Sequence, residues 1–230
     1  MKFYYDLHIH SDLSPCGSSD MTPNNIVNMS YIKGLNIISV TDHNTAKNLP
    51  PVVMLGEKAG IKVLPGIEVT TKEEVHVLCY FRNLIDALEF SNIIYSSLPA
   101  MMNNPFIFGE QNIYNELDEK TGSIEKLLLN SASLSISEVR TMAVSHHGIM
   151  VPAHINKKSN SILGVLGFIP KNLCIDLVEI YDKTAIDEKY VEGLRILRNS
   201  DAHQLVDISE AKNFLELDDI EDIYDYMNIL

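Results

Sequence analysis

The chain opens with a short apolar segment that ends on two histidines, Tyr4-Tyr5-Asp6-Leu7-His8-Ile9-His10. Successive side chains of a strand point to opposite faces, so His8 and His10 would share one face. Six more segments have a similar apolar, β-branched character: residues 37–41, 63–67, 75–78, 149–153, 177–180 and 194–200. Runs of this kind are typical of strands buried on both faces of a parallel sheet. The sequence therefore predicts seven buried strands.

Helix signals lie between most of these segments. Thr22-Pro23 combines an N-cap residue with proline at the first helical position, and Gly34 is placed to end that helix. Ser135 and Glu138 have the spacing of a capping box, and Gly148 follows the helix that they would begin. Strands that alternate with helices indicate an α/β fold, either a (β/α) barrel or a doubly wound sheet.

Two regions depart from this alternation. Residues from about 84 to 130 indicate a helix followed by a hairpin made of 112–116 and 123–129. We interpret them as an insertion, because the alternation resumes afterwards, and we expect a single domain over residues 1–230. Residues 207–230 carry eight acidic residues and one basic residue. This C-terminal segment is expected to be a helix with a solvated acidic face.

Charge and composition restrict the class of function. The 230 residues include 18 Lys and Arg against 31 Asp and Glu, for a formal net charge of −13. A surface this acidic repels polyphosphate, so we expect no binding of long nucleic acid. No apolar run of about 18 residues suggests a membrane span. Cys16, Cys79 and Cys174 are too few and too scattered for a disulfide framework, so a cytoplasmic location is expected and the oligomeric state stays open.

Polar residues recur where the predicted strands end. They are His8, His10, Asp42, His43, Glu68, His76, His154, Asp201 and His203. The carboxyl ends of strands in α/β sheets and barrels share one face, so these side chains would converge there. Imidazole nitrogens and carboxylates bind Zn, Mn and Fe ions. The sequence therefore predicts a site for divalent ions, which would also attract an anionic substrate to an acidic protein.

In their order along the chain, these motifs resemble the polymerase and histidinol phosphatase (PHP) superfamily. They are HxH at 6–10, TDH at 41–43, Glu68, EVHVL at 74–78, AH at 153–154 and SDAH at 200–203. The resemblance implies a distorted (β/α)7 TIM-like barrel, here with the inserted segment, and a trinuclear metal centre. Residues 13–17 and 21–25 further resemble stand-alone bacterial PHP-domain phosphoesterases.

The resemblance also implies which residues hold each ion. A first ion would be bound by His8, His10, Glu68 and Asp201. Glu68 would bridge to a second ion, bound also by His76 and His154, and a third would be bound by His43 and His203. The implied cofactor is two to three divalent ions, Zn, Mn or Fe.

One further ligand of the third ion departs from the family pattern. Many members have Asp or His five or six positions after the second histidine of HxH, where this chain has Pro15 and Cys16. A thiolate is a suitable ligand, especially for zinc, so Cys16 is the candidate. Asp12 and Asp20 are the alternatives.

Clustered divalent ions favour hydrolysis of phosphoesters, because they lower the pKa of bound water and stabilise the transferring phosphoryl group. We expect a metal-dependent phosphoesterase that hydrolyses a small phosphorylated metabolite or nucleotide through a metal-activated hydroxide. His43, His203 and Asp201 would lie at the catalytic centre.

Neighbouring residues are candidates for supporting roles. Lys157 or Lys158, in the loop after the fifth predicted strand, would bind the substrate phosphate, and Asn44 would line the same pocket. Asp6 and Asp42 would orient ligand histidines, as carboxylates beside metal ligands commonly do.

Two other functions remain open. One is a nuclease or exonuclease of the same superfamily, against which the acidic surface argues. The other is a non-catalytic, metal-stabilised regulatory module that uses residues 84–130 for binding, against which the near-complete ligand set argues. An amidohydrolase is less favoured, because no strand-end lysine is placed to bridge two ions.

Overall fold

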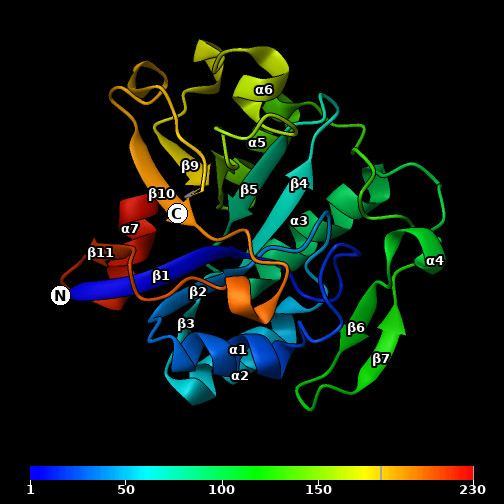
Figure 1. Cartoon of the computed structure of the whole chain (residues 1–230). Helices are drawn as coiled ribbons and strands as arrows, with labels where there is room; N and C mark the ends of the chain where they lie inside the picture. The colour runs from blue at the N-terminus through cyan, green and yellow to red at the C-terminus, as the bar shows by residue number, and fades with distance from the viewer. Residues whose placement is uncertain (182, 230) are drawn as a thin grey trace.

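The computed structural model describes residues 1–181 and 183–229. One sheet has the order β11-β1-β2-β3 (Figure 1). Its strands are β1 (Lys2–Ile9), β2 (Ile37–Val40), β3 (Lys62–Val63) and β11 (Phe214–Glu216). The first three are parallel, whereas β11 pairs antiparallel to β1. Two helices connect the parallel strands and pack on each other, α1 (Pro23–Ile32), capped by Thr22 as predicted, and α2 (Leu49–Ala59).

A second sheet is antiparallel throughout. It has the order β4 (Gly66–Thr70), β5 (His76–Tyr80) and β8 (Ile149–Pro152). Only residues 71–75 separate β4 from β5, and a parallel crossover needs about a dozen or more residues, so the two strands form a hairpin. The expectation of a parallel sheet is therefore wrong here. The expected strand at 63–67 is also divided, because Pro65 has no N–H to donate to a ladder.

A third sheet is the parallel pair β9 (Leu177–Tyr181) and β10 (Arg195–Asn199). Among its described residues, the connection between them contains only a short 3-10 helix, η2 (Glu188–Tyr190). Short junctions join the sheets: the isolated bridges Ile9–Ala202 and His43–Glu68, and a hydrogen bond of 2.9 Å from Ile155 N to Glu179 O. The described residues thus form a mixed α/β fold in which separate sheets are not closed by continuous ladders.

The expected insertion contains α3 (Leu84–Ser97), α4 (Pro105–Phe108) and a hairpin of β6 (Asn112–Tyr114) and β7 (Lys120–Ser123). The second hairpin strand is therefore shorter than the predicted 123–129 segment and overlaps it only at Ser123. Gly109, after α4, packs on the loop that follows β1. A Cβ at Gly109 would lie 2.2 Å from the carbonyl oxygen of Pro15, and the φ of Gly109 is +102°. Only glycine permits this close approach.

One buried apolar cluster of the interior is supplied by strands of all three sheets. It includes Leu7, Ile37, Leu78, Val151 and Leu197. Truncating one of these side chains to alanine costs about 2–5 kcal/mol of stability. The helix α7 (Ile223–Met227), preceded by η4 (Ile220–Asp222), also buries Ile223, Tyr224 and Met227. The acidic C-terminal segment therefore packs one face into the core and is not only a solvated helix.

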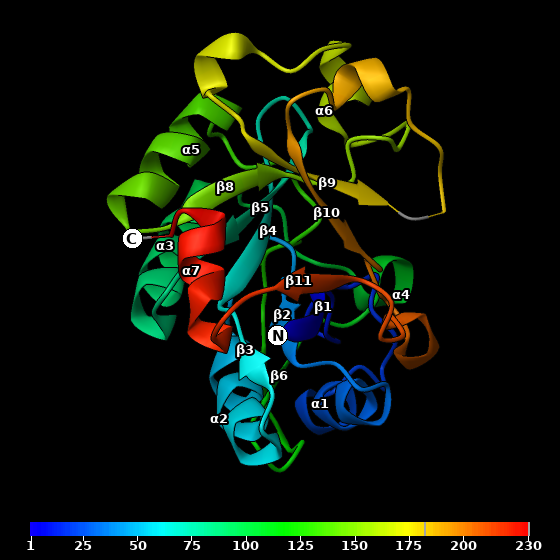
Figure 2. The ribbon, with the colours of Figure 1, turned by 90° about the vertical axis from the view of Figure 1, so that its left-hand side faces the viewer.

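The remaining elements surround these strands. Figure 2 shows α5 (Ile136–Ser145) and α7 on one side of the strands and α4 on the other. α5 begins with the predicted capping box of Ser135 and Glu138. The short elements are α6 (Ile162–Leu166), η1 (Lys171–Leu173) and η3 (Leu205–Asp207). Within the described ranges, no helix has the length and apolar character needed to cross a membrane.

Candidate metal centre

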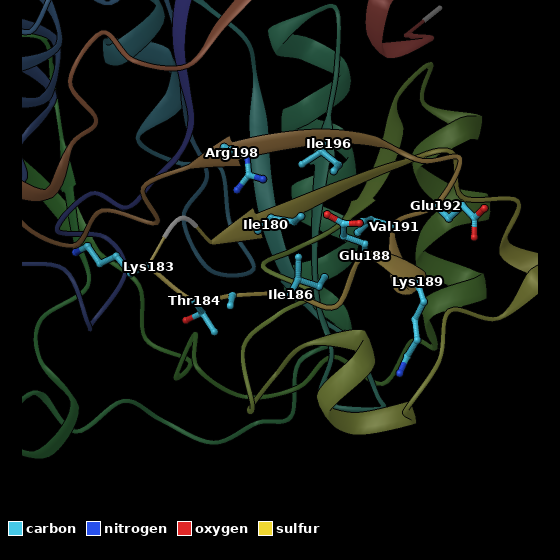
Figure 3. Close-up of a pocket in the computed structure, with 11 residues that line it drawn as sticks. Ile180, Lys183, Thr184, Ile186, Glu188, Lys189, Val191, Glu192, Ile196 and Arg198 are labelled. Atoms are coloured by element: carbon cyan, nitrogen blue, oxygen red, sulfur yellow. The ribbon is translucent and has the colours of Figure 1, made fainter.

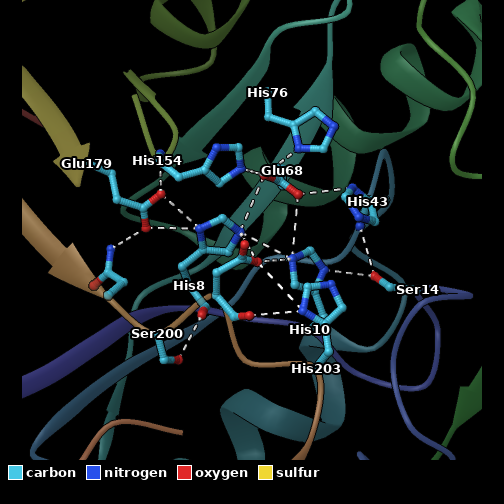
Figure 4. A network of polar contacts seen from close by, with 12 residues as sticks. His8, His10, Ser14, His43, Glu68, His76, His154, Glu179, Ser200 and His203 are labelled. Atoms are coloured by element: carbon cyan, nitrogen blue, oxygen red, sulfur yellow. Dashed lines mark hydrogen bonds and ion pairs between the residues drawn. The ribbon is translucent and has the colours of Figure 1, made fainter. Parts of the chain in front are cut away.

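Glu68, on β4, lies at the centre of a cluster of histidines (Figure 4). Its side chain is 1% exposed. Five imidazole nitrogens surround its two oxygens: His43 Nδ1 and His76 Nδ1 at 3.0 Å, His154 Nε2 at 3.2 Å, His8 Nε2 at 3.4 Å and His10 Nε2 at 3.5 Å. The residues expected at separate strand ends are therefore brought together around one carboxylate.

Asp201 and His203 approach the cluster from the segment after β10. Asp201 Oδ1 lies 3.2 Å from His10 Nε2 and 3.3 Å from His8 Nε2. The φ of Asp201 is +51°, a conformation that residues other than glycine adopt rarely. This unusual backbone accompanies a carboxylate that faces His8 of β1 and His10, the residue after β1.

Asp6 holds the backbone that precedes Asp201. Its buried carboxylate accepts hydrogen bonds from Ser200 N at 3.1 Å, Ser200 Oγ at 2.6 Å and Ser209 N at 2.8 Å. Asp6 was expected to orient a ligand histidine. The structure gives it partners in the loop that carries Asp201.

Hydrogen bonds identify the protonated nitrogen of His8 and His203. The Nδ1 of His203 donates to the carbonyl oxygen of Asp201 at 2.9 Å, because a carbonyl can only accept. The Nδ1 of His8 donates to the carboxylate of Glu179 at 2.9 and 3.0 Å. Each ring therefore turns its Nε2 toward the centre, and this is the arrangement in which imidazole binds a metal ion.

Ser14 determines which ring nitrogen of His10 carries the proton. Its hydroxyl donates to Asp42 Oδ1 at 2.7 Å, so its oxygen accepts from His10 Nδ1 at 3.1 Å and from His43 N at 3.0 Å. Asp42 therefore acts on His10 through Ser14, and its other oxygen accepts from Ser11 Oγ at 2.6 Å. The expected orienting role of Asp42 is consistent with these contacts, although no direct bond to a ring is involved.

Glu179, on β9, is a polar residue of the site that the sequence did not single out. Besides His8, it accepts hydrogen bonds from His154 N and Asn199 Nδ2, both at 2.7 Å. Burial raises the pKa of Glu179, but His8 outweighs it and lowers the pKa below its usual value. In the sequence, Glu179 is the single acidic residue of the apolar run 177–180. Burying a carboxylate is costly unless it has partners, so this position was the one signal of its role.

The charges at the centre are strongly coupled. Burial would raise the pKa of Glu68, but His76, His8 and His43 hold it well below its usual value. Burial would lower the pKa of His8, but Glu179, Asp201 and Glu68 raise it well above. Burial and the charges of His203 and His43 lower the pKa of His10 well below its usual value.

The facing Nε2 atoms of His8 and His10 require a positive charge between them. The two Nε2 atoms are 3.1 Å apart, and the Nδ1 of each ring is already used as a donor. Two lone pairs repel each other at this distance unless a cation lies between them or one ring takes a second proton. A metal ion provides that cation without charging an imidazole.

Two further observations indicate that these ligand residues suit divalent ions. His154 Nδ1 is buried without a hydrogen-bond partner among the described residues, a costly state. Three overlapping sets have ligand atoms within 4.8 Å of one another: His8, His10 and Asp201; His43, Glu68 and His76; and His10, Cys16, His43 and His203. Imidazole, carboxylate and thiolate are the ligands that transition metals prefer.

The three candidates for the last ligand have different surroundings. Asp12 accepts hydrogen bonds from Asn112 Nδ2 at 2.7 Å and from the Tyr114 hydroxyl at 2.5 Å. Asp20 is exposed and belongs to none of the three sets. Cys16 lies beside His43 and His203, which lower the pKa of its thiol to about 7 although burial raises it.

The two lysines suggested for substrate binding also differ. The ammonium group of Lys157 contacts Asp201 Oδ2 and lies 4.4 Å from the centre of the Tyr181 ring. Burial lowers the pKa of Lys157, but Asp201 outweighs this effect and raises it. Lys158 is exposed. Lys157 is thus at the edge of the centre, with part of its side chain open to solvent.

Asn44 is buried and its amide is occupied. Its Nδ2 donates to the carbonyl oxygens of Leu128 and Asn130 at 2.8 and 3.0 Å, and its Oδ1 accepts from Thr70 N at 3.0 Å. These contacts join β4 to the end of the insertion. They give Asn44 a place in the fold and leave its amide little capacity for a substrate.

An open cavity of about 1090 Å³ lies over the other face of β9 and β10 (Figure 3). Ile180, Ile196 and Arg198 contribute to its wall from the strands, and Lys183 and Ile186 from their connection. Ile180 neighbours Glu179, and successive strand residues point to opposite faces. The cavity is therefore separate from the histidine cluster.

The chain is similar to several known proteins. The profile of the PHP domain family matches residues 6–192. A 5′-3′ exoribonuclease of Haemophilus influenzae is 29% identical over 77 residues, which are 32% of this chain and 27% of the relative. An uncharacterized protein of Methanocaldococcus jannaschii is 33% identical over 76 residues, 30% of this chain and 44% of the relative. Both matches thus span less than half of the relative's length.

Solved structures share the fold at low identity. A lesion-specific endonuclease, PfuEndoQ of Pyrococcus furiosus, gives a TM-score of 0.70 at 23% identity, covering 99% of this chain and 56% of the endonuclease. A putative metal-dependent phosphoesterase of Bifidobacterium adolescentis gives 0.66 at 15% identity, covering 96% and 95% of the two chains. These likenesses concern the fold.

Proposed function

Since the chain belongs to the PHP domain family, we propose that it is a metal-dependent phosphoesterase whose catalytic centre is the cluster around Glu68. The observation that carries the proposal is the meeting of five imidazole nitrogens on one buried carboxylate. We take residues 1–230 as one domain, a distorted (β/α)7 barrel with the insertion at about 84–130. Its strand ends surround this cluster.

The residues fall into groups that would bind separate ions. His8, His10, Asp201 and Glu68 would hold one ion, and Glu68, His76 and His154 would hold a second. Bound divalent ions supply Lewis acidity and lower the pKa of water. Glu179 and Ser14 keep the rings of His8 and His10 in the ligating tautomer, which a protein must secure before binding is strong.

Lys157 would bind the phosphate of the substrate. Its ammonium group contacts Asp201 and lies over the Tyr181 ring, and 29% of its side chain is exposed. A phosphate oxygen could replace Asp201 as the partner of its ammonium group. The ammonium group would then pair with Asp201 in the free enzyme and with phosphate in the substrate complex. The acidic surface of the chain favours a small phosphorylated metabolite or nucleotide as substrate.

The proposal is tested by metal content and hydrolysis. Protein purified without chelator should contain two to three Zn, Mn or Fe ions per chain and hydrolyse p-nitrophenyl phosphate. His8→Ala and Asp201→Asn should abolish hydrolysis with unchanged circular dichroism. His146→Ala is the matched control, because His146 ends α5 and bonds to Met142 O at 2.9 Å, away from the cluster. A folded, metal-free protein, or full activity in both variants, contradicts the proposal.

A nuclease activity is the second candidate, and one surface feature favours it. Phe106 and Ile107 of α4 are fully and 70% exposed, and Gly109 packs this turn on Pro15, next to Cys16. An exposed aromatic ring can stack on a nucleobase. The exoribonuclease and endonuclease Q among the similar proteins act on nucleic acid by their names.

Short oligonucleotides separate the two candidates. A nuclease should lose affinity for a short single-stranded oligonucleotide in Phe106→Ala, with p-nitrophenyl phosphate hydrolysis unchanged. Phe168→Ala is the control, because Phe168 is 59% exposed and lies outside α4. No hydrolysis of any oligonucleotide by the active enzyme would exclude this candidate.

A further inference from the structure

The loop after β1 holds Cys16 in a fixed position. Backbone hydrogen bonds run from Ser14 N to Ser11 O at 3.1 Å and from Gly17 N to Ser14 O at 2.7 Å. A Cβ at Gly17 would lie 2.4 Å from the carbonyl oxygen of Ser11, so the turn requires glycine directly after Cys16. The thiol is therefore placed by backbone geometry.

The same loop is tied to the segment that carries His203. Ser18 N donates to His203 O at 2.9 Å. The Nδ1 of His203 is used by the carbonyl of Asp201, so its Nε2 is the nitrogen left for other partners. The thiol of Cys16 lies within 4.8 Å of ligand nitrogens of both His203 and His43. Three potential ligands from three distant parts of the chain thus meet.

The spacing of this group suits a tetrahedral ion. The ligand atoms of Cys16, His43, His203 and His10 all lie within 4.8 Å of one another. Around zinc, bond lengths of about 2.0–2.3 Å separate tetrahedral ligands by roughly 3.3–3.8 Å. Because His10 Nε2 also faces Asp201 at 3.2 Å, His10 can serve the neighbouring ion and leave a fourth position open.

We propose that Cys16, His43 and His203 form a thiolate site that selects zinc over harder ions such as Mn. It differs in kind from the two groups built on Asp201 and Glu68. Those contain a carboxylate, which suits harder ions, whereas this one offers two imidazoles and a sulfur. The inference rests on the proposed metal centre and adds to it a division of metal preference within a single site.

Cobalt provides a direct test, because a bond between Co(II) and thiolate gives a charge-transfer absorption in the near ultraviolet. The full chain exchanged with Co(II) should show this band. Cys16→Ser should lose it, together with about one bound ion per chain. Cys174→Ser is the matched control, because Cys174 is also exposed and lies in none of the metal-binding groups. It should keep the band and the ion.

A second variant tests metal preference and guards against a folding defect. Cys16→Asp replaces the thiolate by a carboxylate, so it should regain the lost ion in Mn(II) but bind it more weakly in Zn(II). Circular dichroism checks the fold of each variant. A Cys16→Ser protein that keeps the band or all of its ions overturns the inference. Wild-type protein that binds ions without a thiolate band also overturns it, whereas wild-type protein that binds no ion contradicts the proposed function itself.

Discussion

The two halves that meet at Glu68 run their strands differently. β1 and β2 are parallel, and β1 brings His8 and His10 to its carboxyl end. β4, β5 and β8 are antiparallel, and here His76 is the first residue of β5, whereas His154 follows the end of β8. Because β5 is reversed, its amino end lies beside the carboxyl ends of its neighbours. A strand can therefore change direction without loss of the site, provided that its ligand moves to the other end.

The strongest test of this meeting is Glu68→Gln, since Glu68 contacts histidines of both halves. The amide carries no charge to balance the ions, so we expect activity to fall more than about 100-fold, with a loss of bound metal. Phosphoesterase assays and metal analysis measure both effects. Glu89→Gln, an exposed residue of α3, is the control. An active Glu68→Gln enzyme would mean that the halves supply independent sites.

A second test removes Glu179 of β9, which forms hydrogen bonds to residues of both halves. Glu179 accepts from His8 of β1 and from the backbone of His154 after β8. Glu179→Ala should lower metal affinity or activity about 10–100-fold. It also leaves three buried donors without an acceptor, each costing about 1–3 kcal/mol, so urea denaturation should show a marked loss of stability. Unchanged metal affinity in a folded Glu179→Ala protein would show that His8 needs no orienting carboxylate.

A third test concerns Lys157, which follows β8 yet contacts Asp201 after β10. Lys157→Met should raise KM for a phosphomonoester roughly tenfold, because a charge-assisted hydrogen bond to phosphate is lost. Lys158→Met, its exposed neighbour, should leave KM unchanged. Equal effects of the two substitutions would indicate a general electrostatic contribution in place of direct binding.

The smallest expected effect concerns the link between the insertion and the loop after β1. Tyr114 donates to Asp12, which raises the pKa of its hydroxyl, together with burial, to about 12. Tyr114→Phe should cost about 1 kcal/mol in the free energy of unfolding and leave metal content unchanged. A change in metal content would show that this hydrogen bond also positions Cys16.

The sequence predicted best those residues whose role depends on their own strand. His8 and His10 could be assigned because a strand places alternate side chains on one face. The reversal of β5 was not predicted, because apolar runs carry no sign of strand direction; the connection of only residues 71–75 became clear with the strand bounds. The partners of Asn44 are set by the tertiary fold, since Leu128 lies 84 residues away. Glu179 was missed because its three donors, His8 Nδ1, His154 N and Asn199 Nδ2, come from distant parts of the chain.

The contact of Gly109 with Pro15 has a consequence for how this chain could be re-engineered. A surface extension that touches its host only at its ends can be exchanged between relatives as a cassette. Here the extension and the ligand loop share a backbone contact without room for a single carbon atom. A transplant of residues 84–130 would therefore have to carry the loop 11–18 with it, so the two should be treated as one unit of design.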